Sequence, residues 1–88
     1  MVTRQLEVRN ELGLHARVAA KITREMKKFE SSVTVKKDGN AYNLKNVTGV
    51  IMSNAKKGDI LTVEFEGPDE KFAAESVAGL FADKFGEK

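Results

Sequence analysis

The sequence has no cysteine and no tryptophan, and its 88 residues include one histidine and one proline. Without cysteine there is no disulfide, no thiolate metal site and no cysteine nucleophile. A single histidine argues against a zinc site made of protein side chains. No apolar run approaches the roughly 18 residues of a membrane-spanning helix, and residues 1–5 resemble no secretion signal. We therefore expect a cytoplasmic protein that does not engage a membrane.

An excess of charge of one sign is also missing. The sequence has 15 lysines and arginines and 13 acidic residues, which gives a net charge of +2. Such a balance lacks the strong positive excess that is typical of nucleic-acid-binding domains. A chain of this length hides only about 60–65% of its unfolded surface, so one core must involve every element. We expect a single domain over residues 1–88, which excludes an enzyme with its cleft between two lobes.

Hydrophobic periodicity divides the first half of the chain into strands and one helix. Apolar and polar residues alternate over residues 2–9 and 33–36, which predicts strands with one polar face. Between them, a stripe with helical spacing predicts a helix that begins at residue 16; its members are Val18, Ile22, Met26 and Phe29. Asp38-Gly39 is a strong hairpin signal, so a third strand should cover residues 40–44.

The second half predicts two more helices and a fourth strand. Asn46 can cap a short helix that ends near residue 52, with Val47, Val50 and Ile51 turned inward. Alternation over residues 61–66 predicts the fourth strand. Asp69 is a candidate N-cap for a last helix that ends near residue 84 and presents Phe72, Val77, Leu80 and Phe81 to the core. The order βαββαβα predicts an α+β open-faced sandwich with three helices on one face of the sheet.

The segment Gly13-Leu14-His15-Ala16-Arg17 combines the features of a phosphate site. It places the only histidine where a helix begins, beside the free N–H groups of the first turn at residues 16–18. Arg17 adds a cation that can bind phosphate oxygens. A helix N-terminus disfavours imidazolium, which leaves one ring nitrogen free as a nucleophile. Phosphoryl transfer needs mainly positioning and charge stabilisation, and this segment supplies both.

A purely structural interpretation of this segment stays open at this point, whereas an RNA-binding function of the sheet is disfavoured. A lone histidine before a helix is often only a neighbour of the N-cap, and an arginine in a first turn is common at a surface. An RNA-binding sheet needs exposed aromatic rings on which bases stack. The outward positions carry none, so we expect no nucleic-acid partner; they are Thr3, Gln5, Glu7, Thr34, Lys36, Thr62 and Glu64.

Two separated motifs resemble those of a known family. The first, residues 12–17 followed by Ala19-Ala20, is similar to the active-site signature of the histidine-containing phosphocarrier (HPr) family of the bacterial phosphotransferase system; it reads Leu-Gly-Leu-His-Ala-Arg. The second, residues 43–50, is similar to the short-helix segment of that family. The resemblance covers essentially the whole chain. It implies an open-faced β-sandwich of four antiparallel strands and three helices.

The resemblance also implies an activity. In the family, the histidine that matches His15 accepts a phosphoryl group on Nδ1 from enzyme I and passes it to an enzyme IIA-type protein. The group is carried covalently, without a metal or cofactor on the carrier, and the arginine that matches Arg17 assists. The backbone of Ala16, Arg17 and Val18 is then the phosphate-binding segment. The residues that map onto the docking surface of the family are Ala20, Arg24, Lys27, Val47, Thr48 and Ile51. We expect a monomer.

Three positions depart from the family pattern. Val18 replaces the usual proline, Asn46 occupies the site of a regulatory serine in many relatives, and Thr48 replaces a common methionine. Asn46 has no hydroxyl to phosphorylate, so that control cannot operate here. Val18 leaves an alternative function open: a regulatory binding module that docks on a permease, kinase or transcription factor with little phosphotransfer. The sequence does not distinguish a sugar-uptake from a nitrogen-type branch.

Overall fold

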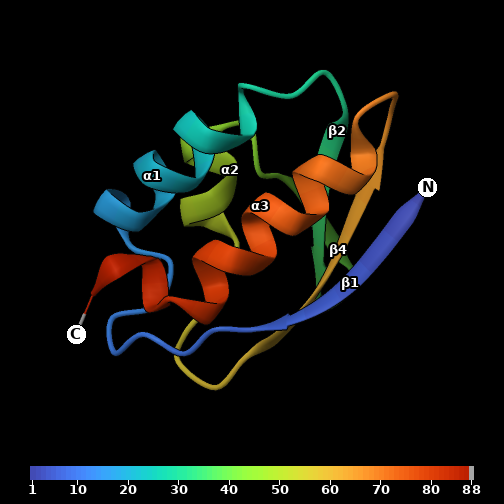
Figure 1. The fold of residues 1–88 in the computed structure, drawn as a ribbon. Coiled ribbons are helices and arrows are strands. Elements are labelled where there is room, and N and C mark those ends of the chain that lie inside the picture. Colours follow the sequence, from blue (N-terminus) through green and yellow to red (C-terminus); the bar gives the residue numbers. More distant parts are fainter. Residues whose placement is uncertain (88) are drawn as a thin grey trace.

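The computed structural model describes residues 1–87, and its elements follow the predicted order (Figure 1). They are β1 (Val2–Glu7), α1 (Ala16–Met26), β2 (Ser32–Lys37), β3 (Asn40–Asn43), α2 (Val47–Met52), β4 (Ile60–Glu66), α3 (Glu70–Ala82) and a 3₁₀ turn η1 (Lys84–Gly86). The hairpin between β2 and β3 turns at Asp38 and Gly39, as predicted; both have positive φ, 52° and 80°. Within residues 1–87 no helix is long and apolar enough to cross a membrane.

The four strands form one antiparallel sheet in the order β1-β4-β2-β3. The last strand therefore lies in the middle, where Val63 pairs with Arg4 of β1 on one side and with Val35 of β2 on the other. Alternation along a strand says which face is apolar but not which strand is the neighbour, so this order was not predicted. All three α-helices cover one face of the sheet, which confirms the open-faced sandwich (Figure 1).

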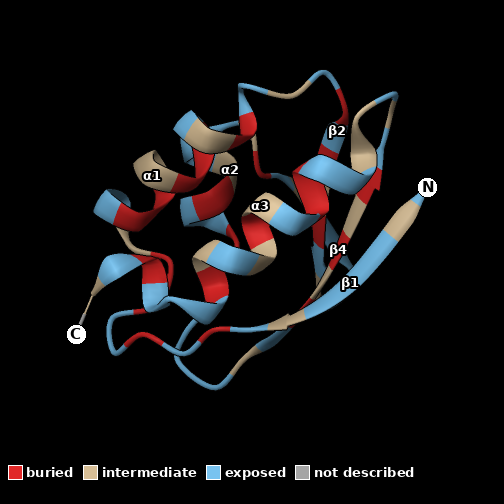
Figure 2. Ribbon diagram, viewed as in Figure 1, coloured by how far each residue is buried: buried red, intermediate tan, exposed pale blue. Residues whose placement is uncertain are grey.

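The core lies between the helices and the apolar face of the sheet. In Figure 2 the buried residues form a band on the helix surfaces that face the strands. The largest side chains that are almost fully buried come from both layers: Val33, Val35, Leu61 and Phe65 from the sheet, and Val18, Ile22, Met26, Val50 and Phe81 from the helices. The predicted stripe of α1 is thus confirmed, although the helix ends at Met26 and Phe29 follows in a turn.

Three residues predicted to face the core do not. Val47 and Ile51 of α2 are 38% and 45% exposed, and only Val50 of that helix is buried. Six residues make less than two helical turns, so the side of the helix that faces the core has room for only one fully buried residue. On α3, Phe72 is 72% exposed. The true stripe of α3 has the spacing of Ala73, Ala74, Val77 and Phe81, which turns Phe72 outward.

The two predicted helix caps have different outcomes. Asn46 caps α2 as expected, because its side-chain oxygen accepts the N–H of Gly49 at 3.1 Å. Asp69 precedes α3, but its side chain does not cap that helix. Its carboxylate instead accepts the backbone N–H groups of Glu30 and Ser31, each at 2.9 Å. The prediction of an Asp69 cap is therefore wrong, and the residue ties the loop after α1 to the start of α3.

After α3 the chain turns back sharply through a segment that we call the C-terminal hook, residues 83–87. α3 ends at Ala82, before the predicted end, and Lys84, Phe85 and Gly86 have φ of 53°, 57° and 77°. A left-handed non-glycine residue costs roughly 1–2 kcal/mol. Burial of the Phe85 side chain, which is 1% exposed and packs edge-on against Phe81 at 4.8 Å between ring centroids, offsets this cost. The hook carries Glu87 to the start of α1.

Candidate active site

His15 occupies the N-cap position of α1 in an extended conformation, with φ −77° and ψ 177°. Its side chain does not cap the helix, and the first helical hydrogen bond runs from the N–H of Ala19 to the His15 carbonyl at 2.8 Å. The N–H groups of Ala16, Arg17 and Val18 therefore have no acceptor within the helix. No acidic residue lies in the first turn. This end of α1 is suited to an anion.

The loop before His15 is held in place by hydrogen bonds at Gly13 and Leu14. Leu14 donates its N–H to the Ala55 carbonyl at 3.0 Å, and the Asn10 side-chain amide donates to the Gly13 carbonyl at 2.7 Å. Gly13 has φ +68°, and a Cβ there would collide with the Ala55 carbonyl. A glycine is thus required for both the turn and the close approach, which together position the imidazole.

The structure adds two residues that the sequence did not indicate, Glu87 and Asn10. His15 Nε2 lies 2.8 Å from a carboxylate oxygen of Glu87, and the Asn10 amide donates to the other oxygen at 2.9 Å. These hydrogen bonds, from Asn10 first and from His15 second, hold the pKa of Glu87 below its usual range, and the positive charge of Arg17 acts in the same direction. His15 and Glu87 are 72 residues apart, and no local pattern marks their contact.

The contact with Glu87 assigns the imidazole proton. An ionised carboxylate only accepts hydrogen bonds, so the proton of a neutral His15 ring sits on Nε2. Nδ1 then holds a lone pair, and it has no hydrogen-bond partner among residues 1–87. The side chains of His15 and Glu87 are 25% and 20% exposed, so the ring is partly shielded yet reachable.

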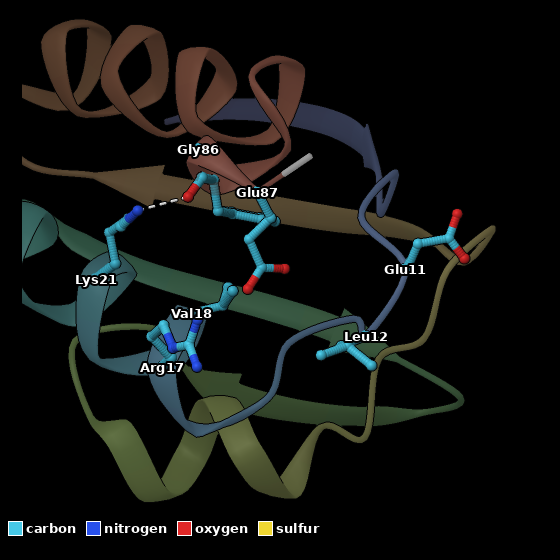
Figure 3. Close-up of a pocket in the computed structure, with 8 residues that line it drawn as sticks. Glu11, Leu12, Arg17, Val18, Lys21, Gly86 and Glu87 are labelled. Carbon is cyan, nitrogen blue, oxygen red and sulfur yellow. Dashed lines mark hydrogen bonds between the residues drawn. The ribbon is translucent and has the colours of Figure 1, made fainter.

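A surface cavity of about 400 Å³ opens beside this pair (Figure 3). It joins the start of α1 to the hook and is lined by Glu11, Leu12, Arg17, Val18, Lys21, Phe85, Gly86 and Glu87. Arg17 is exposed and makes no ion pair within residues 1–87, whereas Lys21 donates to the Phe85 carbonyl at 2.5 Å. Arg17 therefore lies at the same end of α1 as His15 and the first-turn N–H groups, with its guanidinium not engaged in an ion pair within residues 1–87.

The six predicted docking residues lie on two neighbouring helices. Ala20 and Arg24 belong to α1, and Lys27 directly follows it. Val47, Thr48 and Ile51 belong to α2, which contacts α1. All six are exposed except Ala20, which is half-buried. Two further apolar side chains are exposed and were not predicted as site residues: Met52, at the end of α2, and Leu12, which lines the cavity. Within residues 1–87 no three His, Cys, Asp or Glu side chains form a group that could hold a metal ion.

Fold and site together define a class of protein: an open-faced β-sandwich that presents its one histidine at the start of a helix whose first N–H groups have no helical acceptor. The sequence model of the family described as "PTS HPr component phosphorylation site" matches residues 2–83. The chain belongs to this HPr family, and it is a phosphocarrier of the phosphotransferase system.

Relatives cover the chain from end to end. Phosphocarrier protein HPr of Xylella fastidiosa (strain Temecula1) is 38% identical over 87 residues, which is 99% of this chain and 98% of that protein. The crystal structure of HPr-C-His from Thermoanaerobacter tengcongensis superposes with a TM-score of 0.96 at 34% identity and covers 100% of this chain and 99% of that one. An HPr dimer from the same organism matches at 34% identity with a TM-score of 0.79, covering 99% and 100%.

Proposed function

We propose that this phosphocarrier accepts its phosphoryl group on Nδ1 of His15. The observation that carries this assignment is the 2.8 Å contact between Nε2 and Glu87, which occupies one ring nitrogen and leaves the other free. That free nitrogen belongs to the residue at the N-cap of α1, next to three N–H groups without helical acceptors. Nucleophile and anion site thus come from adjacent residues.

In the transfer step the Nδ1 lone pair forms a bond to phosphorus while the bond from phosphorus to the donor breaks. The electron pair of the broken bond leaves with the donor. The N–H groups of Ala16, Arg17 and Val18 and the Arg17 guanidinium stabilise the oxygens of the transferred group. Only the imidazole is needed to hold that group, so we propose that the carrier uses no cofactor or metal of its own. The whole site is on the surface, where partners can complete it.

We further propose that enzyme I is the donor, that an enzyme IIA-type protein is the acceptor, and that the exchange occurs in the cytoplasm as a monomer. Membership of the phosphotransferase system supports these partners and this location. The exposed apolar residues of α2 beside the basic residues of α1 suit brief contacts with acidic partners. All groups of the site come from one chain, which supports a monomer; sedimentation at micromolar concentration distinguishes it from the dimer that an HPr of T. tengcongensis forms.

The assignment of His15 is tested by phosphorylation in solution. The protein is incubated with phosphoenolpyruvate, magnesium and enzyme I, and we expect one acid-labile phosphate per chain, with a phosphorus NMR signal typical of a phosphorylated ring nitrogen. His15→Ala should abolish the label, whereas Asn46→Ala, which alters a helix cap away from the imidazole, should retain it. Labelling of His15→Ala at the wild-type level would disprove the proposal.

A further inference from the structure

The C-terminal hook ends in a hydrogen bond between Glu87 and His15 for which the fold alone gives no reason. Phe85, a buried non-glycine residue with φ 57°, already anchors the hook, and Lys21 binds its carbonyl. Beyond this anchor, Glu87 extends to His15 and Asn10, and its carboxylate accepts a hydrogen bond from each. Unfavourable backbone geometry that places a charged group at a reactive side chain is a common feature of functional sites.

We propose that Glu87, held by Asn10, is a positioning residue that keeps the Nε2 proton on the His15 ring before and after phosphorylation. This inference rests on the proposed function, in which Nδ1 receives the phosphoryl group. Its first consequence concerns the free carrier. The carboxylate selects the tautomer in which Nε2 bears the proton, and so the nucleophilic lone pair is on Nδ1 in nearly every molecule.

The second consequence concerns the phosphorylated carrier. When Nδ1 bonds to phosphorus and Nε2 keeps its proton, the ring carries a positive charge. Glu87 is the carboxylate in contact with that ring, so it stabilises this charge. In the onward step a nucleophile of the acceptor protein forms a bond to phosphorus while the bond between Nδ1 and phosphorus breaks. The electron pair of the broken bond returns to Nδ1, and the ring becomes neutral without losing a proton. A ring kept protonated is the better leaving group, so Glu87 promotes onward transfer.

The other charged groups near the ring do not share this role. From α1, Arg17 and Lys21 line the cavity as cations, and they oppose a positive ring. From the loop before α1, Glu11 lines the same cavity, but its carboxylate is bound to Lys57 at 2.5 Å and its side chain is 73% exposed. From the hook, Glu87 makes the contact itself. Glu11 is therefore a matched control: an acid beside the same cavity that does not contact the histidine.

The test uses the full chain with ¹⁵N-labelled histidine. Imidazole NMR reports the tautomer of the free protein, and a pH titration of the phosphorylated protein reports where the ring loses its Nε2 proton. Glu87→Gln keeps a hydrogen-bond acceptor but removes the charge. We expect it to keep the tautomer, to move the titration midpoint about one pH unit lower, and to slow spontaneous loss of phosphate at that pH by up to about tenfold. Glu87→Ala should also lose the tautomer preference, and Glu11→Gln should change neither quantity.

The outcomes separate this inference from the proposed function. If the wild-type chain accepts no phosphate on His15, the proposed function fails, while the tautomers of wild type and Glu87→Ala remain readable. If phosphorylation proceeds but Glu87→Gln titrates like wild type, the role of Glu87 in the phosphorylated carrier is overturned. An unchanged tautomer in Glu87→Ala overturns its role in the free carrier. Asn10→Ala should weaken the tautomer preference in the same direction, and no change would remove Asn10 from the proposal.

Discussion

At the scale of single residues, the site depends on side chains and on one missing side chain. Gly13 combines a left-handed backbone with a close approach to the Ala55 carbonyl. Gly39, in the hairpin, has a similar φ of +80°, but no atom lies within 4 Å of the place where a Cβ would stand. A substitution at Gly39 therefore reports backbone strain alone, whereas one at Gly13 reports backbone strain together with a steric collision.

We expect Gly13→Ala to destabilise the protein by more than Gly39→Ala. Both substitutions introduce left-handed strain of roughly 1 kcal/mol, and Gly13→Ala adds a collision that displaces the loop before His15. The total for Gly13→Ala should reach about 2–3 kcal/mol, measured as the free energy of unfolding in urea. Equal losses for the two variants would show that the contact with Ala55 relaxes at little cost.

At the scale of elements, α2 illustrates how a short helix divides its residues between core and surface. Val50 is buried, whereas Val47 and Ile51 are left partly exposed beside α1. A short helix with one buried apolar residue and two outward apolar residues contributes little to the core, but it presents an exposed apolar patch that is suited to contacts with other proteins. The sequence led to two predictions for Val47 and Ile51: that they point into the core, and that they dock partners. The first is wrong, and the exposure of both side chains agrees with the second.

Ile51→Glu should slow phosphoryl transfer without unfolding the protein. The substitution places a carboxylate in the apolar part of the proposed docking surface, and we expect the transfer rate from enzyme I at limiting carrier concentration to fall about tenfold. Stability should change by less than about 0.5 kcal/mol, as is usual at exposed sites.

Ile60 offers the matched control for Ile51. Ile60 is the first residue of β4 and is 63% exposed. It pairs with Glu7 of β1 and lies on the polar face of the sheet. Ile60→Glu makes the same chemical change away from α1 and α2, so its transfer rate should equal that of wild type. Equal losses in both variants would contradict docking through α2.

At the scale of the whole molecule, several carboxylates connect distant segments. The Ser31 hydroxyl, followed by the Glu30 N–H, lowers the pKa of Asp69. The neighbouring Gly67 N–H, followed by the distant amino group of Met1, lowers the pKa of Glu70, and the Asn10 amide lowers that of Glu87. A lowered pKa means that the ionised form stabilises the folded state. This contribution is complete above the ordinary pKa of the group and is lost as the pH falls through the lowered value.

We therefore expect stability to be constant near neutral pH and to fall on acidification below the ordinary values, 4.5 for glutamate and 3.8 for aspartate. Asp69→Asn should be less stable than wild type at pH 7, and the difference should shrink as the pH drops below 3.8. Urea midpoints measured between pH 2 and pH 7 provide the check. Asp83→Asn, at an exposed residue, is the control and should follow the wild-type curve. A constant difference between Asp69→Asn and wild type would contradict the expectation.

Most structural features that depend on local sequence patterns could be predicted from the sequence. The stripe of α1, the Asp38-Gly39 turn and the Asn46 cap are decided by neighbours a few residues away, and all three are confirmed. The position of β4 between β1 and β2 and the contact of Glu87 with His15 were not predicted, because each joins segments far apart in the chain. Phe72 was misplaced because hydrophobicity was taken as a sign of burial, although the alanine-containing stripe has the better helical spacing.

The central place of β4 has a consequence for how the chain reaches its folded state. Both β1 and β2 use β4 as their neighbour, so Val2 lies opposite Phe65. During synthesis the first strand leaves the ribosome long before its partner. Until residues 60–66 follow, only the β2–β3 hairpin and the helices α1 and α2 have nearby partners. Closing so long a loop carries a high entropic cost. Folding of the sheet, and with it the joining of hook and histidine, is therefore a late, cooperative event that requires nearly the complete chain.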